Sequence, residues 1–204
     1  MNLGLLGGTF DPVHNAHLFI AEATRIQLGL ERVLFLPTSG AHYRLAPVAP
    51  LEERLAMLRL AIAANPHFAL DPTDLDERAT GYTADLLPRL RERYPEDRLV
   101  FIVGGDSLLE SPWHRFDEVL AQLDSFAVVP RAARPRERID AFVASLPPEQ
   151  RAKIVVLDLP QLAESATYVR DQIGRGGSIR YLVPEPVARH IAELGLYAEH
   201  RLRT

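Results

Sequence analysis

The chain contains no cysteine, so disulfides, thiolate metal sites and a cysteine nucleophile are all excluded. It also lacks an excess of positive charge, because 23 Lys and Arg residues stand against 27 Asp and Glu residues and give a formal net charge of −4. That balance argues against a broad electrostatic surface for nucleic acid. The N-terminal segment has no basic region and reaches Asp11 and Pro12 without a long apolar run, which argues against a signal peptide or a membrane span. We expect a soluble, cytoplasmic protein with a single domain over residues 1–204.

Short apolar runs recur along the chain and predict buried strands. They cover residues 3–6, 33–36, 68–70, 99–103, 127–129 and 154–157. Because these runs are apolar on both faces and helical segments separate them, we expect a mostly parallel sheet covered by helices. The predicted fold class is therefore α/β with a doubly wound sheet, whose ligands bind at the carboxyl ends of the strands.

The first predicted helix covers residues 16–28. Its expected apolar face consists of Phe19, Ala23, Ile26 and Leu30. Gly29 is expected to end this helix, because glycine readily takes the left-handed conformation that commonly follows a helix.

Further helices are predicted over residues 51–64, 84–93, 137–145 and 184–197. The helices over 51–64 and 84–93 are expected to turn basic faces to solvent and to carry no chemistry. The last one begins with a proline in its first turn and ends at Gly195. It would form a small C-terminal helical segment packed on the edge of the sheet.

The segment GGTFDPVHNAH, residues 7–17, follows the first predicted strand. Gly7 and Gly8 can bring backbone amides close to a ligand, and a turn then leads into a helix for which Asn15 is the expected N-cap. The free amides and the positive dipole end of that helix favour an anion. A glycine pair after a strand is also common in purely structural turns. The inference therefore depends on the whole order of strand, glycine pair, turn, paired histidines and helix start, which is the order that phosphate binding requires.

His14 and His17 flank the predicted anion site. Around a helix start, two imidazoles at this spacing can point into one pocket and donate hydrogen bonds to phosphate oxygens. Such a pair can also bind a metal, but no third nitrogen or sulfur ligand lies nearby in the sequence, which disfavours zinc. Thr9 and Asp11 also fit ordinary turn residues.

GGTFDPVHNAH closely resembles the opening signature of the HxGH nucleotidyltransferase superfamily, and GGTFDPVH is similar to the bacterial nicotinate-nucleotide adenylyltransferases in particular. Ala16 stands where the pattern usually has glycine. The resemblance implies a Rossmann-like nucleotidyltransferase fold. It implies transfer of the adenylyl group of ATP to nicotinate mononucleotide, giving nicotinate adenine dinucleotide and pyrophosphate in NAD biosynthesis. It also implies Mg²⁺ that accompanies ATP and is held largely by phosphate oxygens and water, with no metal ligands from the protein.

The resemblance extends over nearly the whole chain and implies roles for individual residues. The implied catalytic residues are His14, His17 and Arg170. The implied ATP contacts are Gly7, Gly8, Thr9, Phe10, Gly104, Asp106, Ser165 and Thr167. In LVFIVGGDSL, a carboxylate after a strand can accept hydrogen bonds from ribose, and in ESATYVR a helix start can meet the triphosphate. Read alone, these two segments also fit a simple helix cap and a capped surface helix.

Contacts to the mononucleotide are implied for Tyr82, Thr83, Trp113, His42 and Arg44. The first two belong to GYTADLL and would bind the nicotinate carboxylate. Trp113, the only tryptophan, would stack on the pyridine ring, although a lone tryptophan is also often a core residue. His42 and Arg44 belong to PTSGAHYRLAP, which takes the place of a family loop usually written PPHK.

Two alternative functions stay open. One is another adenylyl or cytidylyl transferase of the superfamily, for instance with phosphopantetheine as acceptor, and the other is a non-catalytic nucleotide sensor on the same fold. A Rossmann dehydrogenase is disfavoured, because no G-x-G-x-x-G follows the first strand. The expected partners are small-molecule substrates, with no nucleic acid and no membrane. Homo-oligomerisation and the preference for nicotinate over nicotinamide mononucleotide are left open.

Overall fold

The structure is a computed structural model that describes residues 1–39, 46–111, 113–130, 136–160, 162 and 164–199. Its strands are β1 (Asn2–Gly8), β2 (Arg32–Pro37), β3 (Phe68–Leu70), β4 (Arg98–Gly104), β5 (Ser125–Val129) and β6 (Ile154–Val156). Within the described ranges they form one parallel sheet of six strands in the order β3-β2-β1-β4-β5-β6. The predicted α/β class is confirmed, and each predicted strand is present.

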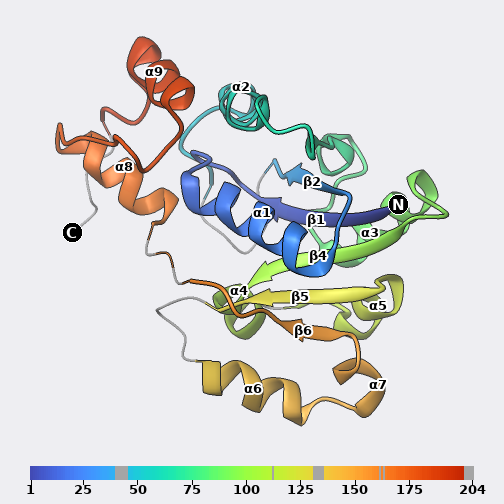
Figure 1. The fold of residues 1–204 in the computed structure, drawn as a ribbon. Coiled ribbons are helices and arrows are strands. Elements are labelled where there is room, and N and C mark those ends of the chain that lie inside the picture. The colour runs from blue at the N-terminus through green and yellow to red at the C-terminus, as the bar shows by residue number, and fades with distance from the viewer. Residues whose placement is uncertain (40–45, 112, 131–135, 161, 163, 200–204) are drawn as a thin grey trace.

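Helices connect the strands (Figure 1). They are α1 (Asn15–Leu28), α2 (Leu51–Ile62), the 3-10 turn η1 (Thr73–Leu75), α3 (Thr83–Arg93), α4 (Gly105–Glu110), α5 (Phe116–Gln122), α6 (Arg136–Ser145), α7 (Pro148–Arg151), α8 (Ala166–Gly174) and α9 (Glu185–Leu194). Helices α4, α5 and α7 were not predicted. These three are short, so they offer little periodicity from which a helix could be recognised.

The strand order places β1 in the middle of the sheet. From β1 the chain moves outward through β2 to β3, then returns to β4 on the other side of β1 and moves outward to β6. The direction of winding therefore reverses between β1 and β4, which are paired in register from Asn2 with Arg98 to Leu6 with Ile102. In open parallel sheets such a reversal leaves a crevice at the carboxyl ends of the strands.

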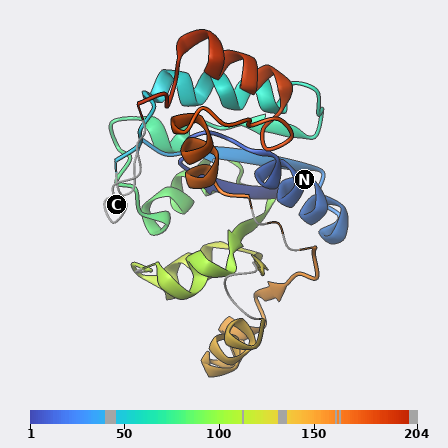
Figure 2. The same cartoon turned by 90° about the vertical axis from the view of Figure 1, so that its left-hand side faces the viewer.

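Two apolar cores cover the two faces of the sheet. Successive residues of a strand point to opposite faces, so Leu6 of β1 joins one core while Leu3 and Leu5 join the other. The core that contains Leu6 is closed by α1, α2, α8 and α9, and the opposite core by α3, α4, α5 and α6. The two views in Figures 1 and 2 show the sheet between these two sets of helices. The doubly wound prediction is thereby confirmed.

The buried face of α1 agrees only in part with the prediction. Leu30 is buried and Phe19 packs against the same core, but Ile26, also expected there, is 66% exposed. The helix instead buries Ala16, Ile20, Ala21 and Thr24. The prediction gave weight to large apolar residues, whereas small residues allow the helix to lie close against the sheet.

The ends of α1 are partly as expected. Gly29 ends the helix in the left-handed conformation with φ of 62°, as predicted. The N-cap, however, is His14 and not Asn15. The side-chain amide of Asn15 donates instead to the carbonyl of Tyr181 at 2.6 Å, which ties the helix start to the segment before α9.

The last helix lies elsewhere than expected. It ends at Gly195 with φ of 62°, as predicted, but it packs beside α2 and not on the edge of the sheet (Figure 1). Val187 and Ile191 of α9 and Met57 of α2 are buried in the same core. The C-terminal segment thus returns to the half of the molecule that contains β1 and β2.

Close packing between α4 and α6 gives a stability prediction. A Cβ on Gly105 would lie 2.5 Å from Cδ1 of Ile139. We expect Gly105→Ala to destabilise the fold by about 1–3 kcal/mol through overpacking. Ile139→Val removes that Cδ1 atom, so the same alanine added to the Ile139→Val variant should cost little. Thermal unfolding of the two single variants and the double variant measures the coupling. Equal losses in both backgrounds would show that the contact with Ile139 is not the cause.

Candidate active site

The loops after β1, β2 and β4 meet at one edge of the sheet. Gly7 and Gly8 close β1, and Gly104 closes β4, its neighbour in the sheet. The amide of Thr38, after β2, donates to the carbonyl of Gly8 at 3.1 Å. Asp106 lies in the first turn of α4, for which Gly104 is the N-cap, so the alternative role of Asp106 as helix cap is wrong. The two predicted glycine segments are therefore neighbours at the switch point of the sheet.

The two predicted histidines lie together at the start of α1. Their ring centroids are 3.7 Å apart, and the ring of Phe10 meets that of His17 edge-on at 5.1 Å. The backbone amide of His14 donates to Nδ1 of His17 at 3.2 Å. Because that ring nitrogen accepts a hydrogen bond, a neutral His17 carries its proton on Nε2. The imidazole can then act as a hydrogen-bond donor through Nε2.

Arg170 reaches this loop from the far end of the chain. The predicted helix start in ESATYVR is present, with Ser165 as the N-cap of α8 and its hydroxyl accepting from the amide of Tyr168 at 3.1 Å. Arg170 donates through Nη1 to the carbonyl of Asp11 at 2.7 Å and through Nη2 to the hydroxyl of Thr167 at 3.3 Å. The helix start and its arginine are thereby joined to the loop that carries the histidines.

The Asp11 carboxylate connects this loop to two other segments. It accepts hydrogen bonds from the amides of Val48 at 2.7 Å and Ala49 at 3.1 Å, and from the hydroxyl of Tyr197 at 2.8 Å. Burial, followed by the negative charge of Asp11 and this hydrogen bond, raises the pKa of Tyr197, so the phenol stays a donor. Asp11 is 5% exposed and forms contacts far beyond its own turn. From the sequence, Tyr197 was expected in a C-terminal helical segment and was not connected with the site.

The burial of Arg54 next to the loops after β1 and β2 was also not predicted. The prediction that the second helix turns its basic face to solvent is wrong at this position, because Arg54 is 2% exposed. Its Nη1 donates to the carbonyls of Thr9 at 2.6 Å and Thr38 at 2.8 Å, and its Nη2 donates to that of Ser39 at 3.4 Å. Burial lowers the pKa of Arg54, and the charge of Asp11 opposes this shift. A sequence signal existed, since Arg54 shares a helical stripe with the buried residues Met57, Leu58 and Ile62.

Two of the residues implied in mononucleotide binding lie at the start of α3. Tyr82 is its N-cap and Thr83 its first residue. The ring of Tyr82 lies 4.8 Å from that of His114, between centroids. The carboxylate of Asp85 accepts from the hydroxyl of Thr80 at 2.6 Å and is paired with Arg115. These contacts join the segment before α3 to the segment before α5.

Trp113 belongs to an aromatic cluster. Its ring is partly buried and meets the rings of Phe101, Phe116 and Phe126 at centroid distances of 6.4, 5.5 and 5.4 Å. Its indole Nε1 donates to the carbonyl of Ser107 at 3.1 Å. The indole is thus fixed in place next to the segment after β4. His42 and Arg44, the other residues implied in mononucleotide binding, lie outside the described residues.

Asp74 is a buried carboxyl group at the same edge of the sheet. It lies in η1, after β3, and is 8% exposed. Burial raises its pKa to about 6, against a hydrogen bond with Thr38 and the charge of Arg89, which both lower it. The usual value is 3.8. A group that titrates in this range next to the loop after β2 was not expected from the sequence.

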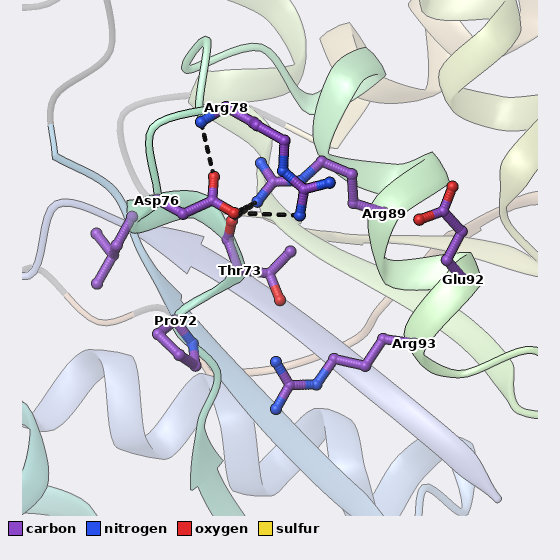
Figure 3. Close-up of a pocket in the computed structure, with 8 residues that line it drawn as sticks. Pro72, Thr73, Asp76, Arg78, Arg89, Glu92 and Arg93 are labelled. Carbon is purple, nitrogen blue, oxygen red and sulfur yellow. Dashed lines mark hydrogen bonds and ion pairs between the residues drawn. The ribbon is translucent and has the colours of Figure 1, made fainter.

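A separate pocket lies on the flank of α3 (Figure 3). Its volume is about 620 Å³, and it is lined by Pro72, Thr73, Leu75, Asp76, Arg78, Arg89, Glu92 and Arg93. Figure 3 shows Arg78 and Arg89 directed toward Asp76, with ion-pair distances of 3.3 and 2.6 Å. None of the predicted site residues that the structure describes lines this pocket, whose lining includes Thr73 and Leu75, the neighbours of Asp74 in η1.

In the described ranges, no group of three His, Asp or Glu side chains could hold a metal ion. No helix in that part of the chain has the length and apolar character needed to cross a membrane.

Comparisons with known proteins cover most of the chain. Residues 5–172 match the model of a family described as cytidylyltransferase-like. A protein of Exiguobacterium sibiricum, named probable nicotinate-nucleotide adenylyltransferase, is 39% identical over 97% of this chain and 100% of its own length. A protein of Thermomicrobium roseum with the same name is 39% identical over 96% of this chain and 91% of its own.

A solved structure shares the fold. The Plasmodium falciparum nicotinic acid mononucleotide adenylyltransferase complexed with NaAD superimposes with a TM-score of 0.78 over 97% of each chain. The two sequences are 16% identical. The likeness confirms the predicted Rossmann-like nucleotidyltransferase fold.

The burial of Asp74 gives a prediction about pH. The pKa of Asp74 is higher in the folded state than its usual value of 3.8, so ionisation lowers stability as the pH rises from about 4 to above 6. Asp74→Asn cannot ionise and should be more stable than the wild type at pH 7.5, by about 1–3 kcal/mol. At pH 4 the difference should nearly vanish. Denaturant unfolding at the two pH values measures both quantities.

Asp76→Asn serves as the control, because its effect on stability should change with pH in the opposite direction. Partial burial raises the pKa of Asp76, but the hydrogen bond from the amide of Arg78 and the charge of Arg89 outweigh it, so the net shift is downward. Loss of this carboxylate should therefore cost more stability at pH 7.5 than at pH 4. A stability difference for Asp74→Asn that is constant between the two pH values would contradict the assignment.

Proposed function

We propose catalytic and binding roles for the residues of this chain, which belongs to the cytidylyltransferase-like family and, within it, to the nicotinate-nucleotide adenylyltransferases. The activity is the transfer of the AMP group of ATP to nicotinate mononucleotide, which yields nicotinate adenine dinucleotide and pyrophosphate in NAD biosynthesis. The observation that carries the proposed roles is the meeting of the loop of residues 7–17 with Arg170 at the switch point of the sheet.

The reaction needs no nucleophile from the protein. A phosphate oxygen of the mononucleotide attacks the α-phosphorus of ATP in line, and a bond forms between them. The bond from the α-phosphorus to the bridging oxygen of pyrophosphate breaks, and its electrons leave with pyrophosphate. Catalysis then consists of holding the two phosphates together and stabilising the charge that develops.

Donors around the loop after β1 would bind the ATP phosphates. Amides of Gly7, Gly8 and Thr9 can approach closely, since two of these residues lack a side chain. His14 and His17 would donate to oxygens of the reacting phosphates as negative charge builds up. The fixed tautomer of His17 supports this role, because it places a proton on Nε2.

The pyrophosphate that leaves would be stabilised from α8. The free amides at its start and the hydroxyl of Thr167 can bind phosphate oxygens, and Arg170 supplies a cation with two donors on one plane. Two hydrogen bonds fix the direction of Arg170, to the carbonyl of Asp11 and to Thr167. Phe10, Gly104, Asp106 and Ser165 complete the proposed ATP site, in which the Asp106 carboxylate would accept from ribose.

Mononucleotide binding is proposed for Tyr82, Thr83 and Trp113, together with His42 and Arg44. The amide end of α3 suits the nicotinate carboxylate, because the first turn of a helix has free amides and a positive dipole end. Trp113 would offer one of its ring faces to the pyridine.

Mg²⁺ is proposed to enter with ATP, where it would neutralise part of the charge on the triphosphate. The ion would be held largely by phosphate oxygens and water.

The acceptor can be tested with pyrophosphate release. With ATP and Mg²⁺, nicotinate mononucleotide should support release, and phosphopantetheine should give only the background rate. The comparison with nicotinamide mononucleotide measures the preference between the two pyridines. Release with phosphopantetheine alone would make the acceptor wrong, and no release with any acceptor would favour a nucleotide sensor.

His17→Ala tests the proposed donor. We expect turnover to fall on the order of 100-fold or more, because removal of one donor to a developing charge costs about 3–4 kcal/mol in other enzymes. Binding of nicotinate mononucleotide should change little. His67→Ala is a matched control, because His67 is exposed and lies just before β3, at the opposite edge of the sheet. A folded His17→Ala variant with wild-type turnover would exclude the role.

A further inference from the structure

Arg54 is a buried cation that no part of the proposed mechanism uses. It is 2% exposed and is among the largest fully buried side chains of the described residues. Its hydrogen bonds end on backbone carbonyls, those of Thr9, Thr38 and Ser39. Its Nε is buried and has no hydrogen-bond partner. A buried guanidinium held by neutral groups alone is unusual, because burial of a charge is costly unless an opposite charge compensates it.

The negative charge near Arg54 compensates its burial only in part. Asp11 is the carboxylate whose charge acts on Arg54, and its oxygens already accept from the amides of Val48 and Ala49 and from the hydroxyl of Tyr197. Among the described residues, Asp74 is a further acidic group, bonded to Thr38. Burial still outweighs the charge of Asp11 and lowers the pKa of Arg54. An added anion in front of the loop after β1 would therefore stabilise the buried cation.

Arg54 lies where the phosphate groups of the substrates could supply this anion. Thr9 belongs to the loop after β1, to which the ATP phosphates are assigned, and Thr38 belongs to the loop after β2. The phosphate of the mononucleotide must lie beside the ATP phosphates, because it attacks the α-phosphorus. One nitrogen of Arg54 bonds both carbonyls, at 2.6 and 2.8 Å. The two loops are also joined directly, by the bond from Thr38 to Gly8. The charge therefore lies behind the loop after β1, in a medium where screening is weak.

We propose that Arg54 is a positioning residue for the reacting phosphate groups of both substrates. Its guanidinium holds the loop after β1 against Thr38, and its charge attracts the phosphates that meet at the loop after β1. The proposal rests on the proposed function, because it takes the loop after β1 as the place where the two phosphates react.

A purely structural role predicts a different result. If Arg54 only supported the two loops, its removal would weaken every ligand of the site by a similar factor. A role through charge should affect ligands that carry phosphate and spare those that do not. The ratio of affinities between a nucleotide and its nucleoside is therefore the decisive measurement.

The experiment compares Arg54→Met with Arg59→Met. Arg59 lies on the same helix and is exposed, so the control removes the same charge from the surface. Dissociation constants are measured for nicotinate mononucleotide and ATP, and inhibition constants for nicotinate riboside and adenosine. In Arg54→Met we expect both nucleotides to bind at least tenfold more weakly, while both nucleosides stay within about twofold. In Arg59→Met all four constants should stay within about twofold.

Two further variants separate the loss of the charge from a loss of stability. Arg54→Gln is neutral but keeps a donor for one carbonyl, and should show the same selective loss as Arg54→Met. Arg54→Lys keeps the charge and should retain more nucleotide affinity than Arg54→Gln. The loss in the neutral variants should persist at about 0.5 M salt, because a buried charge is screened little.

Several outcomes would overturn the proposal. A folded neutral variant that binds nucleotides as the wild type does excludes it, and so does an equal loss for nucleotides and nucleosides. If both neutral variants fail to fold even with ATP present, Arg54 serves stability alone. A wild-type protein that binds neither nucleotide contradicts the proposed function itself, and is recognised before any variant is compared.

Discussion

The carboxylate of Asp11 is the group on which the arrangement of the site depends. It is buried and accepts from the amides of Val48 and Ala49 and from the hydroxyl of Tyr197, while its backbone carbonyl accepts from Arg170. One residue therefore joins the loop after β1 to the segment before α2, to α8 and to the chain after α9. A buried carboxylate needs such donors, because without them its burial would be costly. The need of this carboxylate for donors thus brings three distant segments of the chain together, and the backbone carbonyl of the same residue adds α8.

The topology of the sheet determines where the site lies, and the polar contacts determine how its loops are arranged. Reversal of winding between β1 and β4 opens a crevice at the carboxyl ends of the strands, as in other doubly wound folds. That topology alone would leave the loops free to take many arrangements. Hydrogen bonds from Arg54 and Arg170 to carbonyls of the loop after β1 restrict them. The proposed chemistry needs this restriction, since positioning and charge are all that it uses.

Much of this fold could be predicted from the sequence, and part of the site could not. Strands were recognisable because burial on both faces leaves short apolar runs, and the segment of residues 7–17 was recognisable because its order of residues is local. Ile26 was misplaced because helix periodicity does not say which stripe meets the sheet. The burial of Arg54 could have been recognised from its helical stripe, but its partner Thr9 lies 45 residues away and the local sequence does not indicate it. Tyr197 was missed because its partner Asp11 lies 186 residues away. The roles of the implied residues stay predictions.

The central claim is that the chain acts by positioning two phosphates, with no covalent intermediate on the protein. The stereochemistry at the α-phosphorus tests this most directly. ATP made chiral there with sulfur should be turned over with nicotinate mononucleotide, and the configuration of the dinucleotide product determined. A single in-line displacement predicts inversion. Retention of configuration would show two displacements through an adenylyl group on the protein, for example on His14 or His17, and would contradict the account.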